Sequence, residues 1–368
     1  MSRPVHGGNL AWAARLVGCA PTELLDFSAS ISPLGPPRSV SEAIQAAFSS
    51  MVAYPDPQYG ELREAIARHH AISPDCVLPG NGAAELLTWA ARDLAELTCC
   101  FRLTPGFSDY DRALGAFGAN LADVRLLSSQ GWDWDWDMAL SAVSSGSDLS
   151  QCGLLLNNPH NPTGALFTRS RLGPLLSRFG LVVVDEAFMD FLPAGREQSV
   201  VDWVSEFPNL VVVRSLTKFY SLPGLRLGYA IAQPDTLKRW QQWRDPWSVN
   251  VLAAAAGVAA LGDRAFQQQT WAWLAAANAQ MYEGLSNLPG LSVLPSCANF
   301  FLVGCEVSAL ALQSELLERH RIYIRDCVSF AELGDRYFRV AVKTPADNQR
   351  LVSALAGVLP DLEVSHAG

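Results

Sequence analysis

Lys218 is the residue whose surroundings first indicate covalent chemistry. It closely follows the apolar run Leu210–Val213 and is followed by the aromatic pair Phe219 and Tyr220. An amine in such apolar surroundings has a lowered pKa and can form an imine with an aldehyde cofactor. The alternative is a solvated lysine in a surface loop, with no chemical role.

Ser215 and Arg226 lie on either side of Lys218 in the segment SLTKFYSLPGLRLGY. Both side chains could bind one phosphate, the serine through its hydroxyl and the arginine as a bidentate cation. The segment is therefore compatible with a phosphorylated aldehyde cofactor that Lys218 holds as a Schiff base.

Asp185 ends the apolar run in VVVDEAF. An unpaired carboxylate is costly to bury at such a position, so it requires a cationic partner. A protonated pyridine nitrogen would supply one, and the carboxylate would keep the ring able to accept electrons. Capping of a turn or an ion pair with an arginine is the alternative for a single aspartate.

Two loops could supply further ligands. NNPHNPTG contains two Asn-Pro steps and a final glycine, which force an irregular loop. Its Asn161 amide could donate to a phenolic oxygen of the cofactor, although the loop could also be only a turn. PGNGAAELL is a glycine-rich turn whose backbone N–H groups could hold a phosphate at a helix N-terminus. It does not match the dinucleotide-binding fingerprint, which requires glycine where Glu85 stands.

These candidate residues follow short apolar runs that alternate with helix-length segments between about residues 75 and 232. The alternation predicts an α/β fold with a largely parallel sheet and helices on both faces. Leu181–Val184 and Leu210–Val213 are apolar throughout, which predicts central strands. Ligands of such sheets bind beyond the carboxyl ends of the strands, where the candidate residues lie. The predicted strands are CVLPG, TCCFRLTP, ADVRLL, CGLLLNNP, GLVVVDEAF, NLVVVRSL and LRLGYAIA.

The C-terminal third predicts a smaller α+β domain. An alanine-rich helix over Val249–Leu261 and a second helix over Phe266–Leu288 lead into the segments LSVLP, NFFLVGC, ALALQSELLERH, IYIRDC and YFRVAV. We therefore expect residues 1–35 to associate with the small domain and the active site, residues 36–250 to form the large cofactor-binding domain, and residues 251–368 to form the small domain.

Composition disfavours several classes of protein. The 368 residues, 49% of them apolar, suffice for two unequal domains. A net charge of -9 without a basic stripe argues against a nucleic-acid partner. The longest apolar stretch is shorter than the ~20 residues of a membrane-spanning helix, and the N-terminus lacks a signal-peptide pattern, so we expect a cytoplasmic protein. The eight cysteines lack CxxC spacing, so we expect neither disulfides nor a metal site.

HNPTG, VDEAF and SLTK followed by Arg226, with TPGF before them and YFRVA near the end, resemble the class I/II aminotransferase family over nearly the whole chain. The resemblance implies fold type I and the cofactor pyridoxal 5′-phosphate (PLP). It makes Lys218 the Schiff-base lysine, Asp185 the partner of the pyridine nitrogen and Asn161 the donor to the ring oxygen. Phe107 would stack on the ring.

The same resemblance implies how two anions are bound. The cofactor phosphate would be held by the backbone of Ala83 and Ala84, by Ser215 and Arg226, and by Tyr54 of a second subunit, which implies a homodimer. Arg339 of FRVA would bind the substrate carboxylate. Many aminotransferases have DEAY where this chain has Phe188, so the usual tyrosine hydroxyl on the ring oxygen is absent.

Within that family the chain is similar to the threonine-phosphate decarboxylases of cobalamin synthesis, in HGGN, LLDFSASISPLGPP, AYPDPQY, TPGFSDY, VDEAFMDF and PWSVN. The similarity implies conversion of L-threonine O-3-phosphate to (R)-1-amino-2-propanol O-2-phosphate and carbon dioxide. We expect His6 and the backbone of Gly7 and Gly8 to bind the substrate phosphate with Arg325, and Asn161 and Arg339 to contact the substrate as well. The alternative for His6 is a mobile N-terminal histidine without a ligand.

Two other functions compete with the decarboxylase. A histidinol-phosphate aminotransferase would share the YPDPQ-like segment, a phosphorylated substrate, and both Arg325 and Arg339 as anion binders. Phe188 and the HGGN opening favour the decarboxylase. A PLP-sensing transcription regulator would need a DNA-binding domain, and only about 35 residues without a helix-turn-helix pattern precede the core.

Overall fold

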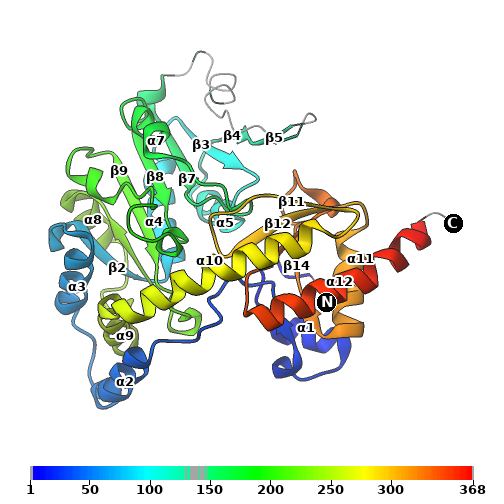
Figure 1. The fold of residues 1–368 in the computed structure, drawn as a ribbon. Helices are drawn as coiled ribbons and strands as arrows, with labels where there is room; N and C mark the ends of the chain where they lie inside the picture. Colours follow the sequence, from blue (N-terminus) through cyan, green and yellow to red (C-terminus); the bar gives the residue numbers. More distant parts are fainter. Residues whose placement is uncertain (1–2, 129–130, 133–139, 141–145, 147, 367–368) are drawn as a thin grey trace. The chain divides into compact units, whose positions relative to one another are not determined.

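A computed structural model describes residues 3–128, 131–132, 140, 146 and 148–366 (Figure 1). The chain divides into two compact units. Unit 1 comprises Met1–Pro33, Asn161–Ala165 and Trp271–Gly368, and unit 2 comprises Leu34–His160 and Leu166–Thr270.

Unit 2 contains a seven-stranded sheet in the order β2-β10-β9-β8-β7-β3-β4. β10 is antiparallel to both of its neighbours, and the remaining pairs are parallel. The predicted mostly parallel sheet and all seven predicted strands are thereby confirmed. The strands are β2 (Val77–Asn81), β3 (Cys99–Thr104), β4 (Leu121–Arg125), β7 (Cys152–Asn157), β8 (Leu181–Asp185), β9 (Leu210–Ser215) and β10 (Leu227–Ile231).

Apolar side chains on both faces explain the central position of β8 and β9. Side chains alternate between the faces of a strand, so Val183 and Ala230 share one face, where they join the core formed with α4 (Ala83–Ala95), α5 (Asp109–Ala116) and α8 (Pro234–Gln241). Leu227 faces the opposite side. There a β-carbon on Gly257 of α9 (Val251–Gly262) would lie only 2.7 Å from Leu227 Cδ2. Helices therefore cover both faces, as predicted.

Helix α9 belongs to unit 2. It packs against α2 (Arg38–Ala47) and α3 (Gly60–His70), while α7 (Arg169–Leu176) packs against β8. Because of these contacts the compact units divide after Thr270, later than the expected boundary at residue 250. The first 33 residues fall in the same unit as the C-terminal residues. The functional division into three segments stays a prediction.

Unit 1 is built on an antiparallel sheet in the order β11-β12-β15-β14. A short parallel pair, β1 with β13, ties the N-terminal region to this unit. The mixed composition agrees with the expected α+β arrangement. Its elements are α1 (Leu10–Val17), β1 (Leu25–Asp26), β11 (Leu291–Val293), β12 (Phe300–Cys305), α11 (Ala309–His320), β13 (Ile322–Tyr323), β14 (Arg325–Asp326), β15 (Tyr337–Ala341) and α12 (Pro345–His366); α10 (Arg264–Ser286) begins in unit 2, as does the hairpin of β5 (Leu127–Ser128) and β6 (Gly131–Trp132).

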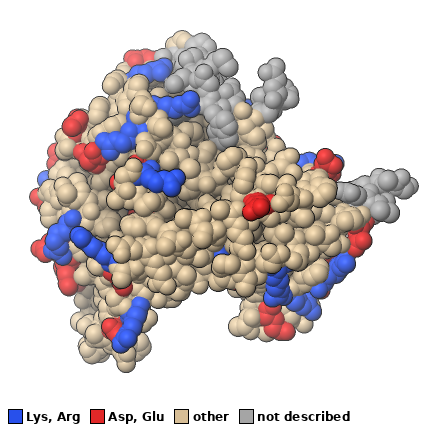
Figure 2. All heavy atoms as spheres, viewed as in Figure 1, with Lys and Arg blue, Asp and Glu red and all other residues tan. Residues whose placement is uncertain are grey.

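The surface carries both signs of charge. Figure 2 shows basic and acidic side chains interspersed on the viewed face, with a wide area that carries neither. In the described part of the chain, no helix has the length and apolar character required to cross a membrane. The described residues also contain no group of three or more His, Cys, Asp or Glu side chains that could hold a metal ion.

Candidate active site

The parallel register brings the predicted loops of unit 2 to one edge of the sheet. Asp185 at the end of β8 lies opposite Asn157 of β7 and Val213 of β9. The backbone continues this pairing beyond the strands, because Asn158 N donates to Asp185 O over 2.9 Å and Glu186 N donates to Val213 O over 2.8 Å. The loops that follow β7, β8 and β9 therefore leave the sheet side by side.

Asp185 is a buried carboxylate with both oxygens hydrogen-bonded. The Tyr110 hydroxyl donates to Oδ2 over 2.9 Å, and Ala187 N donates to Oδ1 over 3.0 Å. Burial raises the pKa of Asp185, and the two hydrogen bonds and the charge of Lys218 oppose that increase. The group can therefore serve as the acceptor for a cationic ligand atom.

Tyr110 is a member of this group that the sequence did not identify. It lies on α5, is 2% exposed, and meets Phe107 edge to face at a centroid distance of 5.5 Å. Its spacing of three residues from Phe107 places both rings near the start of one helix, which was the available signal. Tyr110 thus connects the predicted ring-stacking residue with the predicted ring-nitrogen partner.

Lys218 is half-buried in the loop that follows β9. Its Nζ lies 3.5 Å from Thr217 Oγ1 and 5.5 Å from the centre of the Phe188 ring. Thr217 Oγ1 in turn lies 2.7 Å from Ser215 Oγ, so the lysine and the serine share one polar neighbour. Phe188 is buried and presents an apolar ring to Lys218 at the position where a tyrosine is common in the family.

Glycine at position 82 allows Arg226 to approach the N-terminus of α4. Gly82 has φ +77°, and a β-carbon there would lie 2.6 Å from Arg226 Nη2. Gly82 is the N-cap of α4, and no side chain caps the helix. The guanidinium of Arg226 therefore lies beside the uncapped N–H groups of Ala83 and Ala84, an arrangement suited to an anion.

A second glycine brings Ser215 to the same place. Gly228 of β10 pairs with Ser215 of β9, and a β-carbon on Gly228 would lie 2.6 Å from Ala83 N. Only a residue without a side chain permits this approach of β10 to the helix N-terminus. Ser215 thus neighbours the strand residue that touches the start of α4, and its hydroxyl, the Arg226 guanidinium and the backbone N–H groups form a donor set suited to a phosphate dianion.

Glu85 fixes the turn that supplies these N–H groups. Its Oε2 accepts from Asn81 N over 2.6 Å, and its Oε1 accepts from Trp89 Nε1 over 3.2 Å. Arg244 forms a buried ion pair with the same carboxylate at 3.2 Å. The residue that rules out a dinucleotide fingerprint thus has a positioning role, which its sequence motif did not indicate.

Unit 1 contains two arginines directly opposite each other, Arg325 on β14 and Arg339 on β15. Arg339 donates to Asn161 Oδ1, and its guanidinium lies 5.0 Å from the centre of the Phe300 ring. Burial, with the nearby charge of Arg325, lowers the pKa of Arg339 to about 10. Like charges on opposite strand positions repel, so this pair favours an anionic ligand.

The N-terminal segment is held by Arg325 and Ser28 of the same unit. Arg325 Nη2 donates to Val5 O, and Gly8 N donates to Ser28 Oγ over 2.7 Å. Gly7 packs so closely that a β-carbon would lie 2.1 Å from Ser28 O. The structure therefore brings the segment that contains His6 to Arg325, and the His6 side chain is exposed.

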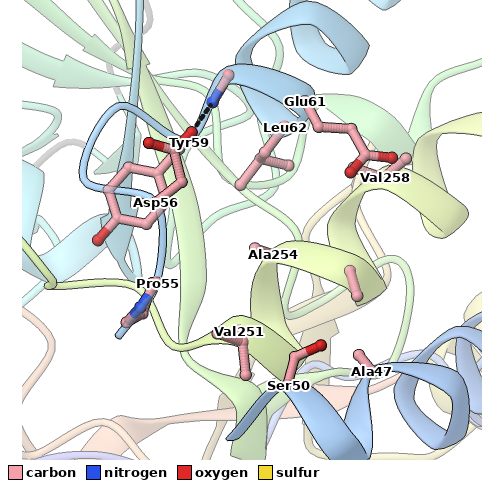
Figure 3. Close-up of a pocket in the computed structure, with 12 residues that line it drawn as sticks. Ala47, Ser50, Pro55, Asp56, Tyr59, Glu61, Leu62, Val251, Ala254 and Val258 are labelled. Carbon is pink, nitrogen blue, oxygen red and sulfur yellow. Dashed lines mark hydrogen bonds between the residues drawn. The ribbon is translucent and has the colours of Figure 1, made fainter. Parts of the chain in front are cut away.

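Tyr54 lies on the surface of unit 2, where its ring stacks on Trp247 at a centroid distance of 4.5 Å. Residues on either side of Tyr54 in the sequence help to line a cavity of about 320 Å³. It lies between α9, the start of α3 and the 3-10 helix Phe48–Val52 (Figure 3). Figure 3 shows Val251 and Ala254 of α9 on one side and Pro55 and Tyr59 on another. Its lining is mostly apolar and contains none of the predicted catalytic residues.

The sequence is similar to known proteins over nearly the whole chain. Residues 22–355 match the model of the family "Aminotransferase class I and II". The threonine-phosphate decarboxylase of Salmonella typhimurium is 41% identical over 359 residues, which cover 96% of each chain. The adenosylcobalamin biosynthesis bifunctional protein of Leptospira interrogans is 29% identical over 97% of this chain and 41% of its own length. The histidinol-phosphate aminotransferase of Symbiobacterium thermophilum is 35% identical over 92% of this chain and 91% of its own.

Solved structures have the same fold. The L-threonine-O-3-phosphate decarboxylase of Porphyromonas gingivalis has a TM-score of 0.80 at 25% identity, over 91% of this chain and 99% of its own. The histidinol-phosphate aminotransferase of Sinorhizobium meliloti, in complex with pyridoxal 5′-phosphate, has a TM-score of 0.83 at 25% identity, over 98% of this chain and 96% of its own. This chain belongs to the class I and II aminotransferase family.

Proposed function

We propose that this protein is a PLP-dependent enzyme that decarboxylates L-threonine O-3-phosphate to (R)-1-amino-2-propanol O-2-phosphate and carbon dioxide, a step of cobalamin biosynthesis. The observation that carries the proposal is the 41% identity to a threonine-phosphate decarboxylase over 96% of both chains. The structural similarity to a second decarboxylase supports it.

The residues of unit 2 fit PLP. When bound, the cofactor supplies an electron-withdrawing ring that accepts the electron pair left by the departing carboxylate. The glycines at 82 and 228 leave room for Arg226 and Ser215 to meet the N-terminus of α4, as a phosphate requires. Lys218 would hold the aldehyde carbon, and Asp185 would bind the ring nitrogen.

Four further residues complete the proposed cofactor site. The backbone N–H groups of Ala83 and Ala84 would bind the phosphate together with Ser215 and Arg226. Phe107 would stack on the ring, and Asn161 would donate to the ring oxygen. The contacts of Phe107 with Tyr110 and of Asn161 with Arg339 support these roles, because each fixes the orientation of a ligand group.

Arg325 and Arg339 would bind the two anionic groups of the substrate. Their opposite positions on β14 and β15 concentrate positive charge, which a phosphate and a carboxylate would neutralise. His6 and the backbone of Gly7 and Gly8 would add donors to the phosphate, since Arg325 holds their segment through the Val5 carbonyl.

Lys218 also determines the outcome of the reaction. Once carbon dioxide has left, Nζ of Lys218 would donate a proton to the α carbon of the substrate, and Lys218 would then displace the product amine by re-forming its own bond to the aldehyde carbon. In an aminotransferase the proton goes to a different carbon. The centre of the Phe188 ring lies 5.5 Å from Lys218 Nζ, and Phe188 lacks the hydroxyl that a tyrosine at this position would place on the ring oxygen, which supports the decarboxylase.

A histidinol-phosphate aminotransferase is the second candidate. The relative from Symbiobacterium thermophilum and the structure from Sinorhizobium meliloti favour it at the level of fold and cofactor. It would use the same cofactor group and the same two arginines. Phe188 and the HGGN opening favour the decarboxylase over this candidate.

We also propose that the protein is a homodimer in which Tyr54 binds the cofactor phosphate of the partner. An apolar surface patch supports this proposal: Phe48, Met51, Val52, Tyr54 and Trp247 are all exposed, with Val52 at 94% and Tyr54 at 78%. Such a patch is unfavourable in water and is typical of a protein interface. The cytoplasmic location and the absence of a nucleic-acid partner stay predictions.

The test is to incubate the PLP-loaded protein with L-threonine O-3-phosphate, in the absence of any keto acid, and to follow carbon dioxide. We expect steady release over many turnovers. Absence of release, with transfer of the amino group from glutamate to imidazole-acetol phosphate, would assign the protein to the second candidate.

A further inference from the structure

The hydroxyl of Tyr110 is a polar group within an apolar core. The ring packs among the aliphatic side chains of α4 and α5, and it is almost completely buried. Its hydroxyl donates over 2.9 Å to Oδ2 of Asp185, which is also buried. A phenylalanine would pack equally well against these neighbours, so packing alone does not account for the hydroxyl.

The charged groups around Asp185 show what the hydroxyl changes. Burial favours the neutral acid, and Asp109 of α5 acts in the same direction. Asp109 is itself paired with Arg112, whose Nε lies 2.6 Å from Oδ1. Lys218, Tyr110 and Ala187 N favour the carboxylate. Of these, Tyr110 is the neutral side-chain donor, and its removal changes no charge.

We propose that Tyr110 is a positioning residue that keeps Asp185 ionised and oriented toward the ring nitrogen of bound PLP. The inference rests on the proposed function, since it assigns Asp185 to that nitrogen. Tyr110 holds Oδ2 and Ala187 N holds Oδ1, so the plane of the carboxylate is fixed from both sides. The remaining lone pairs are then presented to the ligand in one orientation.

The inference has a defined pH dependence. Burial raises the pKa of Tyr110 well above its usual value, so the phenol remains a neutral donor throughout the working range. Loss of a donor to the charged form raises the pKa of a carboxyl group. In Tyr110→Phe, Asp185 therefore gains its proton at a higher pH, and the acidic limb of PLP binding and of activity moves to higher pH.

The experiment measures the dissociation constant of PLP from the holoenzyme at pH 6 and pH 8 in four variants. These are Tyr110→Phe, Asp185→Asn, the double variant and the matched control Tyr229→Phe. Tyr229 is also a fully buried tyrosine, and its hydroxyl lies 2.8 Å from His70 Nε2 rather than from Asp185. Both single tyrosine variants thus remove one buried hydrogen-bonded hydroxyl.

We expect Tyr110→Phe to weaken PLP binding about tenfold at pH 6, the effect of one hydrogen bond to a charged group, and less at pH 8. The control should leave the pH dependence of PLP binding unchanged. In the Asp185→Asn background, Tyr110→Phe should have little further effect, because the two changes act through one interaction.

The outcomes separate the inference from the proposed function. If Asp185→Asn leaves PLP binding unchanged, the assignment of Asp185 to the ring nitrogen fails. If Asp185→Asn weakens binding but Tyr110→Phe behaves as the control does, only the inference fails. An undiminished effect of Tyr110→Phe in the double variant also overturns it.

If Tyr110→Phe does not fold, 3-fluorotyrosine at position 110 replaces it, because its more acidic phenol is a stronger donor of nearly the same size. The acidic limb should then move to lower pH, and an unmoved limb overturns the inference.

Discussion

Single side chains in the proposed site are defined by what lies next to them. Lys218 is adjacent to a phenylalanine ring and to Thr217, which it shares as a neighbour with Ser215. Asp185 owes its properties to burial and to two donors. Residue types alone therefore do not determine the chemistry, because a lysine or an aspartate elsewhere on the surface would lack these surroundings.

Replacement of Lys218 by alanine would remove the amine that, in the proposed site, links the cofactor and donates the proton. We expect Lys218→Ala to lower turnover by about 10³-fold or more, with an unchanged circular dichroism spectrum. Thr217→Ser retains the neighbouring hydroxyl and is the control for local disturbance. Full activity of the Lys218 variant would contradict its assignment.

In the proposed site, His6 binds the phosphate of the substrate and does not contact the cofactor. We expect His6→Ala to raise KM for L-threonine O-3-phosphate about tenfold, as for one charge-assisted hydrogen bond, and to leave PLP binding unchanged. Steady-state kinetics and PLP titration on the same preparation test both parts. An unchanged KM would exclude His6 from the phosphate site.

Secondary-structure elements position these side chains through backbone contacts. The antiparallel strand β10 passes the N-terminus of α4 at Gly228, and it pairs Gly228 with Ser215. Glu85, in the first turn of α4, accepts a hydrogen bond from the backbone N–H of Asn81, which lies just before the helix. The proposed phosphate site therefore depends on strands β9 and β10, on helix α4 and on the turn between β2 and α4.

Gly82→Ala tests this arrangement, with Gly18→Ala as a control for substitution of a positive-φ glycine that has no close neighbour. Both glycines have positive φ, but Gly18 (φ +65°, ψ +39°) is in the left-handed helical region, which alanine adopts at a cost of about 1 kcal/mol, whereas Gly82 (φ +77°, ψ +161°) is in a region that is essentially restricted to glycine. Gly82→Ala therefore also incurs the larger backbone strain, and the melting temperature of both variants is measured beside PLP binding. Only at Gly82 does the new methyl group meet Arg226, whereas at Gly18 no atom lies within 4 Å. We expect Gly82→Ala alone to weaken PLP binding, by about tenfold or more, in a fluorescence titration. Equal PLP affinities of the two variants would remove Arg226 from the phosphate site.

At the scale of the whole molecule, the proposed homodimer explains two observations together. The apolar surface patch on unit 2 is exposed in the single chain, and the Tyr54 side chain is 78% exposed although the family resemblance assigns it to a cofactor phosphate. A partner subunit would cover the apolar patch, and its cofactor phosphate would bind the Tyr54 hydroxyl. The site would then require two copies of the chain.

Val52→Glu introduces a charge at the most exposed position of this patch, and Tyr54→Phe removes only a hydroxyl. We expect sedimentation velocity to show a monomer for Val52→Glu and a dimer for Tyr54→Phe. PLP affinity should fall for both, by a few-fold for the loss of one hydroxyl donor. A wild-type protein that sediments as a monomer would contradict the dimer and the role of Tyr54 with it.

The sequence determined those features that depend on local pattern. Unbroken apolar runs such as Leu181–Val184 predicted the buried strands. The polar residues at the ends of these runs, Asp185 among them, predicted that the ligand-binding edge of the sheet is the one formed by the carboxyl ends of the strands. Both follow from the periodicity of a strand and from the cost of burying an unpaired charge. The resemblance of the motifs extended this to the family and the cofactor.

Only the tertiary structure decided the contacts between residues far apart in the chain. Tyr110 and Asp185 are 75 positions apart and meet at 2.9 Å, and Gly228 meets Ala83 only because β10 is antiparallel to β2. The packing of α9 on α2 and α3 likewise moved the boundary of the compact units beyond residue 250. Such contacts depend on strand order and helix packing, which the local pattern of a single sequence does not encode.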